Sequence, residues 1–397
     1  MGVLPMKQFL FDFTQFFTDK NATLADIRIT AIDIESRSEH LNPKVNTAAA
    51  IMITRLQKLD TVKAAIRHTL AKRDLLTEVE TKGEHNQVAV RDINTADAVK
   101  ELNKKYPGRV AMINMANRQS VGGDVFNGSY AQEERLFVTT DIAGSLLSYA
   151  QQTGGSQTFD HNNFTRPHFH ENAFDQTDIL YSSNKILRDV DDKIQFTDLK
   201  PEDQTPVNII TTAAIRYNPE EKCYYEKYYR NGKNVTVAYT EEEAKKILYA
   251  TIYNQIHTIL VNGNKAAVLS AFGCGAFRNH PQVIANIYRD VLSLPEFYGK
   301  LETQFAIFKN PTLKNYEVFA DVFKAPLVKL NAEKTKEIHC YVESGHTIRG
   351  KYKEVAPSAK SAGPFLLSGS LFAIEAHASL ESRHHHGSSN TTIPKKR

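Results

Sequence analysis

The sequence predicts an α/β fold in which a sheet is wound with helices. Short apolar runs, such as 108–114 and 207–215, indicate buried strands, and segments with the three-to-four-residue apolar spacing of helices stand between them. Strands that alternate with helices favour a wound sheet, which binds ligands at the carboxyl ends of its strands. Two glycine-bearing loops follow predicted strands, so we expect the ligand there.

The remaining elements are predicted by periodicity and by capping signals. An apolar stripe over residues 46–80 predicts a mainly helical N-terminal part. A helix is expected over residues 131–149, after the first glycine loop. Thr240 and Glu243 have the spacing of a capping box, which opens another helix. Further strands are predicted at 266–272 and 305–308, and a further helix at 281–294.

We expect the chain to have three parts. Residues 1–105 are predicted to form a mainly helical segment, residues 106–325 an α/β domain with both glycine loops, and residues 326–397 a C-terminal extension. The tail from Ser382 onward is polar and basic, so we expect it to be loose. Residues 151–171 are rich in Gln, Gly, His, Asn and Thr and have no period, which indicates a surface excursion.

Composition excludes several classes of protein. With 41% hydrophobic and 24% charged residues among 397, the chain can bury a core and is not a disordered tether. A net charge of only +4 argues against a nucleic-acid groove but suits an anionic small ligand. The three cysteines form no CxxC pair, which fits a reducing compartment. No spanning apolar run and no secretory signal are present, so we expect a cytoplasmic protein without a membrane partner.

The first glycine loop and the residues after it carry the most chemistry. Gly122 and Gly123 let backbone N–H groups approach a phosphate closely, because no side chain blocks the path. Glu133 and Glu134 then supply carboxylates for ribose hydrogen bonds and for acid/base work at a glycosidic carbon. Each feature alone is common, since paired glycines often form turns and Glu in a first helical turn offsets the helix dipole.

The second glycine loop also has small residues that allow a phosphate group to approach its backbone. Gly273, Gly275 and Ala276 leave room for a diphosphate, and Phe277 is placed to pack on a ribose or a base. Asn279, followed by proline, is a good helix start that offers free N–H groups to an anion.

Together these segments resemble the signature of poly(ADP-ribose) glycohydrolases (PARGs), in particular the short bacterial-type members of the macrodomain superfamily. That signature is a glycine triplet, a gap, and then Gln-Glu-Glu, which stands here at 132–134. The resemblance extends over residues 110–308, because segments similar to two central strands and to a second phosphate loop follow in family order at 179–189, 208–214 and 272–281. It implies a macrodomain-like mixed sheet flanked by helices, with 106–325 as the catalytic domain.

The resemblance also implies roles for individual residues. Glu134 would be the catalytic carboxyl, which protonates the departing oxygen and then activates water at C1″, and Glu133 would bind a ribose hydroxyl. Asn117 would orient the distal ribose. Neither a metal nor another cofactor is required. The implied ADP-ribose ligands are Asn117, Gly122, Gly123, Gln132, Gly273, Cys274, Gly275, Ala276 and Phe277.

Asp124 departs from the family pattern, which has a third glycine at this position. One interpretation is a solvent-facing or turn-capping side chain. The other adds Asp124 to the catalytic residues: it would meet a cationic acceptor, such as arginine-linked ADP-ribose, by pairing with the guanidinium. Some macrodomain hydrolases of intracellular bacterial pathogens attack arginine linkages. The long flanks 1–108 and 325–397 would suit a protein-directed enzyme of this kind, translocated into a host cell as a bacterial effector.

We therefore expect an ADP-ribosyl hydrolase whose partner is the ADP-ribose moiety of a modified protein. A poly(ADP-ribose) glycohydrolase and a non-catalytic ADP-ribose reader remain alternatives. Cys274 has no histidine beside it in the sequence, so we expect a small buried thiol rather than a nucleophile. Ligand-type side chains in the excursion are interpreted as loop decoration rather than a metal site: His161, His168, His170 and Glu171.

Overall fold

A computed structural model describes the part of the chain that carries both glycine loops. The described residues are 10–12, 67–68, 88–125, 131–140, 142–156, 158–160, 167–170, 173–187, 205–230, 233–348 and 351–354. The predicted loose tail lies outside them, as does the predicted N-terminal helix except for Arg67–His68, which form a strand.

The main sheet has seven strands in the order β2-β6-β7-β4-β11-β12-β3. The five strands from β7 to β3 are parallel to one another, whereas β6 runs antiparallel to both β7 and β2. The prediction of a mixed sheet flanked by helices is therefore confirmed. The strands are β2 (Arg67–His68), β3 (Val88–Arg91), β4 (Val110–Met115), β6 (Leu180–Leu187), β7 (Thr205–Thr212), β11 (Ala266–Leu269) and β12 (Glu302–Ala306).

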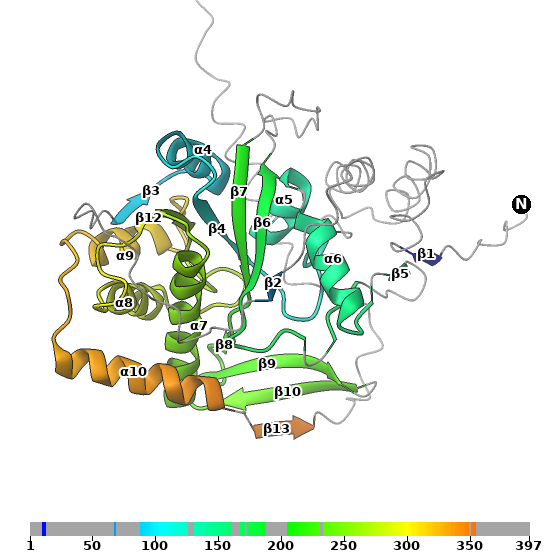
Figure 1. Cartoon of the computed structure of the whole chain (residues 1–397). Coiled ribbons are helices and arrows are strands. Elements are labelled where there is room, and N and C mark those ends of the chain that lie inside the picture. Colours follow the sequence, from blue (N-terminus) through cyan, green and yellow to red (C-terminus); the bar gives the residue numbers. More distant parts are fainter. Residues whose placement is uncertain are drawn as a thin grey trace, which may run out of the picture. The chain divides into compact units, whose positions relative to one another are not determined.

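Helices cover the sheet on two faces, with a separate hydrophobic core under each (Figure 1). Alternate residues of one strand point into different cores. Met112 of β4 belongs to the core that includes residues of α4, α5 and α6, whereas Ile113 belongs to the core that includes residues of α7, α8, α9 and α10. The helices are α4 (Thr95–Lys105), α5 (Gln132–Thr139), α6 (Ile142–Gln152), α7 (Glu241–Val261), α8 (Pro281–Leu292), α9 (Asn315–Val322) and α10 (Ala332–Thr347).

The predicted start of α7 is confirmed, and its geometry is that of a full capping box. The Thr240 hydroxyl accepts from the backbone N–H of Glu243 at 3.2 Å, and Glu243 Oε2 accepts from the Thr240 N–H at 2.8 Å. This exchange satisfies two of the N–H groups that a helix start leaves without partners.

The single helix predicted over 131–149 is wrong, because it is interrupted after Thr139. Thr140 has extended backbone, pairs with Leu187 as an isolated bridge, and accepts from the Ile142 N–H with its hydroxyl. A β-branched residue that finds strand pairing and a local side-chain bond has less reason to continue a helix.

A second, four-stranded sheet was not predicted from the sequence. Its order is β13-β10-β9-β8, formed by β8 (Arg216–Asn218), β9 (Cys223–Arg230), β10 (Lys233–Tyr239) and β13 (Lys351–Glu354). All three strand pairs are antiparallel. Because β8 follows the carboxyl end of β7 closely, this sheet begins at the edge where the parallel strands end (Figure 1).

The predicted surface excursion is partly ordered against the first glycine loop. The Val121 N–H donates to Pro167 O at 2.9 Å, and the Phe169 N–H donates to Gln119 O at 3.1 Å. The Phe169 side chain is buried and packs edge-on against Phe174. The same excursion contributes β5 (Thr158–Asp160), which pairs with β1 (Leu10–Asp12).

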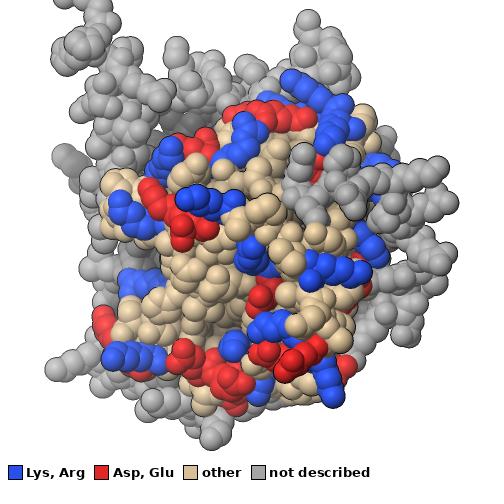
Figure 2. All heavy atoms as spheres, turned by 90° about the vertical axis from the view of Figure 1, so that its left-hand side faces the viewer, with Lys and Arg blue, Asp and Glu red and all other residues tan. Residues whose placement is uncertain are grey.

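The predicted domain boundaries at about 105 and 325 stay a prediction, although β3 and α4, which precede residue 106, join the main sheet and its core. On the face shown in Figure 2, basic and acidic side chains are interspersed. No helix in the described ranges is long and apolar enough to cross a membrane.

Candidate active site

Both glycine loops leave the same edge of the main sheet. The first follows β4 and leads to α5, and the second follows β11 and leads to α8. Since β4 and β11 are neighbouring parallel strands, their carboxyl ends lie side by side. The fold thus brings together the two loops that the sequence analysis singled out.

Gln132 joins the start of α5 to the end of β4. Its Oε1 accepts from the Met115 N–H at 2.8 Å, and its Nε2 donates to Ile113 O at 2.6 Å. This pair of bonds fixes where α5 begins relative to the sheet. The amide of Gln132 is therefore engaged with backbone, and its predicted contact with ADP-ribose stays a prediction.

Glu133 closes the first loop by accepting from both of its ends. Its Oε2 accepts from the Asn117 N–H at 2.7 Å, and its Oε1 accepts from the Gly122 N–H at 3.1 Å. The side chain is buried, and burial together with the nearby Glu134 charge raises the pKa of Glu133 well above its usual value. Its observed contacts are those of a loop-closing group, and its predicted ribose contact remains untested.

Glu134 lies beside the same loop, one residue further along the helix. Its Oε1 accepts from the Asp124 N–H at 2.8 Å, and the residue is 6% exposed. Burial is the main cause that raises the pKa of Glu134 above its usual value, and the Asp124 charge acts in the same direction. A carboxyl with a raised pKa can hold a proton nearer to neutral pH, as a general acid must.

The two glycines of the first loop are required by their geometry. Gly122 and Gly123 have φ values of +77° and +59°, in the left-handed region that glycine tolerates best. A Cβ on Gly122 would meet the Phe137 ring at 2.5 Å, and one on Gly123 would meet Glu134 Oε1 at 2.3 Å. Asp124 is not among the described residues with left-handed backbone, so an L side chain at that position costs no backbone strain.

Asn117 shapes the entry to the first loop. Its Oδ1 accepts from the N–H groups of Gln119 at 2.9 Å and Ser120 at 3.2 Å, as in an Asx turn. The Asn117 backbone N–H is already bound to Glu133. The predicted role of Asn117 in orienting the distal ribose stays a prediction.

The second loop is held by Asn279, but not as a helix cap. Its Nδ2 donates to Ile215 O at 2.8 Å and to Gly273 O at 3.2 Å, and the N-cap of α8 is His280, which has no side-chain capping bond. The expectation that Asn279 starts the helix is therefore off by one residue. A Cβ on Gly273 would lie 2.4 Å from Asn279 Nδ2, whereas one on Gly275 would meet no described atom within 4 Å.

Phe277, at the end of this loop, is tied to the small sheet. The Tyr217 N–H donates to Phe277 O at 2.8 Å, and the Arg216 guanidinium carbon lies 4.2 Å from the centre of the Phe277 ring. Arg216 carries no signal in the sequence, because β8 is too short to show a strand pattern.

Cys274 is buried, and burial raises the pKa of its thiol far above the usual value. A thiol held protonated is a poor nucleophile, which agrees with the predicted buried thiol. Ala276 stands in the same loop, exposed, and its contact with ligand remains a prediction. Among the residues described, no group of three or more His, Cys, Asp or Glu side chains could hold a metal ion. His168 pairs through its backbone with Ser120 and Ser156, while His161 and Glu171 lie outside the described residues.

The first glycine loop lies in a part of the chain that matches a known protein family. Residues 43–188 match the family model of the microbial-type PARG catalytic domain. The match includes the first loop and the Gln-Glu-Glu motif, and it confirms the predicted resemblance to this family. Its bounds differ from the predicted 110–308, because it begins within the N-terminal flank and ends before the second glycine loop. A match to a catalytic domain also agrees with the prediction of an enzyme. No curated protein sequence is a significant match to the chain.

Several solved structures of bacterial PARGs are similar to the chain. PARG from Deinococcus radiodurans in complex with ADP-ribose is 22% identical, with a TM-score of 0.42 over 60% of this chain and 84% of that chain. PARG from Thermomonospora curvata bound to the inhibitor ADP-HPD is 20% identical, with a TM-score of 0.45 over 76% and 99%. A mutant of the Thermomonospora curvata enzyme is 20% identical, with a TM-score of 0.48 over 70% and 98%.

Proposed function

We propose that the chain is an ADP-ribosyl hydrolase that cleaves the glycosidic bond at C1″ and releases ADP-ribose from modified protein. The observation that carries the proposal is the position of Glu134: its buried carboxyl accepts from the Asp124 N–H, directly beside the loop of Gly122 and Gly123. An ADP-ribose whose diphosphate lies against that loop would present its distal ribose to this carboxyl. The match of residues 43–188 to a PARG catalytic domain supports the same chemistry.

In the proposed reaction, one carboxyl serves two steps. Glu134 enters protonated, since burial raises its pKa, and gives its proton to the departing oxygen or nitrogen as the bond to C1″ breaks. The carboxylate that results then takes a proton from the water that attacks C1″. The adjoining diphosphate favours the positive charge that develops on an oxocarbenium-like carbon. These steps require only the chain's own residues, the substrate and water.

The linkage we favour is arginine to a single ADP-ribose, and Asp124 is the residue that favours it. Its backbone N–H binds Glu134, and its charge helps to raise the pKa of that carboxyl, so the two carboxyls are neighbours. A guanidinium that leaves from C1″ near Glu134 would therefore come close to a carboxylate with which it can pair. For a polymer the leaving group is a neutral ribose, which gains nothing from this charge.

Release of ADP-ribose from matched substrates tests the proposal. Wild type and Glu134→Gln are compared on poly(ADP-ribose), on glutamate- or serine-linked protein and on arginine-linked protein, with ADP-ribose affinity measured by calorimetry. We expect release from arginine-linked protein that the Glu134→Gln variant loses while it keeps its affinity. Binding without release from any substrate would mean a reader, and release from polymer alone would mean a poly(ADP-ribose) glycohydrolase.

Asp124→Ala and Asp124→Asn separate the charge of this residue from its size. Both variants keep the backbone N–H that binds Glu134. If Asp124 pairs with the guanidinium, both should lose activity on arginine-linked protein and keep it on the other linkages. Equal losses on every linkage would contradict the pairing and would indicate that Asp124 only shapes the loop.

A further inference from the structure

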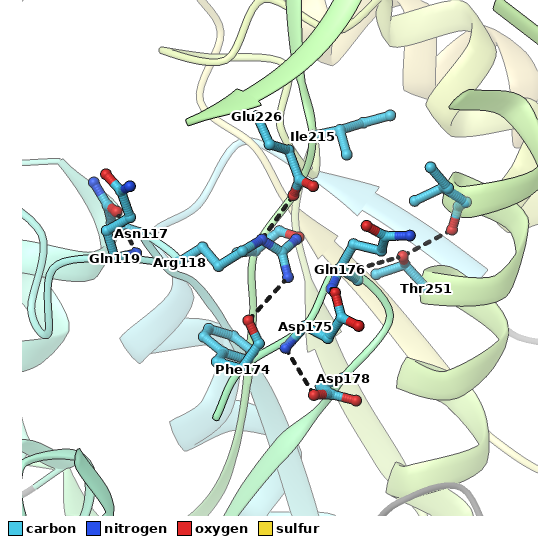
Figure 3. Close-up of polar contacts among 12 residues, drawn as sticks. Asn117, Arg118, Gln119, Phe174, Asp175, Gln176, Asp178, Ile215, Glu226 and Thr251 are labelled. Carbon is cyan, nitrogen blue, oxygen red and sulfur yellow. Dashed lines mark hydrogen bonds and ion pairs between the residues drawn. The ribbon is translucent and has the colours of Figure 1, made fainter. Parts of the chain in front are cut away.

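Arg118 follows Asn117 directly in the sequence, and its cationic side chain is buried. It is 8% exposed, and Figure 3 shows its side chain pointing away from those of Asn117 and Gln119. Its Nε lies 2.7 Å from Glu226 Oε1, and its Nη2 and Nη1 donate to Ala213 O at 2.9 Å and to Phe174 O at 3.4 Å. The planar fork of the guanidinium thus contacts three separate segments at once.

The partners of Arg118 are themselves fixed. The Tyr239 hydroxyl donates to Glu226 Oε2 at 2.7 Å, so the Glu226 carboxylate of β9 is also bound to a residue of β10. The carbonyl of Phe174 belongs to a turn that is closed by a bond from the Asp175 N–H to Asp178 Oδ2 at 2.7 Å. Thr251 of α7 donates to the carbonyl of Gln176 in the same turn (Figure 3). Because these acceptors are themselves held in place, the Arg118 guanidinium also fixes the position of the backbone at residue 118.

The same small sheet also holds the second loop. Glu226 lies on β9, next to β8. The Tyr217 N–H of β8 donates to the Phe277 carbonyl, and the Arg216 guanidinium of β8 lies over the Phe277 ring. The Ile215 carbonyl, one residue before β8, accepts from Asn279. Both glycine loops are therefore tied to one rigid element, the first through Arg118 and the second through β8.

We propose that Arg118 and Glu226 are positioning residues, which set Asn117 and the first loop at a fixed distance from the second loop so that Glu134 meets C1″. This inference rests on the proposed function. Neither side chain has to touch substrate. A misplacement of about 1 Å at a reacting centre can cost about 100-fold in rate, which is the size of effect that such a pair can control.

A purely structural pair would behave differently on removal of both charges. Replacing a buried ion pair by groups of similar volume is often neutral or stabilising, whereas removing one partner leaves an unpaired buried charge. We therefore expect the double variant Arg118→Met with Glu226→Gln to keep the fold while it releases the first loop from Ala213, Phe174 and β9. The control is Lys105→Met with Glu302→Gln, which removes an ion pair with a more exposed lysine at the first residue of β12, at the opposite end of the parallel strands.

The experiment measures thermal unfolding, ADP-ribose affinity by calorimetry, and kcat and KM on the substrate that wild type hydrolyses. We expect the double variant to unfold cooperatively, with kcat reduced about 100-fold and KM changed much less. The control should keep wild-type kcat. Wild-type kcat in a folded double variant would overturn the proposal.

If the double variant does not fold, the single variant Arg118→Lys tests whether Arg118 positions the first loop. Lysine keeps the charge opposite Glu226 but lacks the fork that also reaches Ala213 and Phe174. We expect a folded protein with reduced kcat, and unchanged kcat would overturn the proposal. An inactive wild type on every linkage would instead contradict the proposed function itself, so the two failures are distinguishable.

Discussion

A methyl group on Gly123 would lie 2.3 Å from Glu134 Oε1, so the carboxyl proposed for catalysis rests directly on the backbone of the first loop. The same oxygen accepts from the Asp124 N–H at 2.8 Å. The loop and the carboxyl can occupy these positions together only because residue 123 has no side chain. This contact couples ligand binding by the loop to the position of the acid.

Gly123→Ala should therefore impair catalysis more than folding. The added Cβ pushes the Glu134 carboxyl away, and we expect kcat to fall by about 100-fold. The control is Gly108→Ala, because Gly108 also has left-handed backbone, with φ +68°, but a Cβ there meets no atom of the described part of the chain within 4 Å. Both variants should lose about 1–2 kcal/mol of stability from backbone strain. Equal kcat in the two variants would show that Gly123 does not control the carboxyl.

The rate should depend on pH through Glu134. Burial raises its pKa, and the proposed first step requires its protonated form. We expect kcat to be highest below this raised pKa and to fall as pH rises through it. The Asp124→Asn variant removes a neighbouring negative charge, so the fall should move to lower pH. A rate that is independent of pH in this range would remove Glu134 from proton donation.

The free energy of unfolding should also fall with rising pH because of Glu134. Between the unfolded pKa of about 4.3 and the raised folded pKa, the folded state binds more protons than the unfolded state, so the free energy of unfolding falls as pH rises. Glu134→Gln removes this titration but keeps an oxygen to accept from Asp124. Urea unfolding should show that the free energy of unfolding of the variant, relative to that of wild type, is higher at pH 8 than at pH 5. A constant difference between the two would mean an unshifted pKa.

The sequence predicted those features of the fold whose signals are local. β11 is a continuous apolar run, β4 is apolar except for Asn114, and the start of α7 is indicated by Thr240 and Glu243. The interruption at Thr140 was missed because its cause, pairing with Leu187, depends on a strand far along the chain. The small sheet was missed for another reason: one of the buried positions on β9, next to the buried Tyr224 on the same face, is a charged Glu226, which breaks the apolar alternation of a strand.

The candidate site was predicted as a set of residues but not as a network. The motif located Glu133 and Glu134, and the structure adds that Glu133 accepts from both ends of the loop. Arg118 carried no signal, because a lone arginine in a polar loop normally faces solvent. Only the fold reveals that it is buried against Glu226.

Gly275→Ala tests whether the second loop holds the diphosphate. A Cβ on Gly275 would meet no atom of the described residues within 4 Å, and its φ lies outside the left-handed range, so stability should not change. If a diphosphate lies against this backbone, the methyl group takes its place, and we expect ADP-ribose affinity to fall about tenfold, with a larger loss for Gly275→Val. Gly263→Ala is the converse control, because Gly263 has φ +78° in open space and lies outside both loops. That control should unfold at a lower temperature with unchanged affinity, and a Gly275→Ala variant that binds as wild type does would show that the diphosphate lies elsewhere.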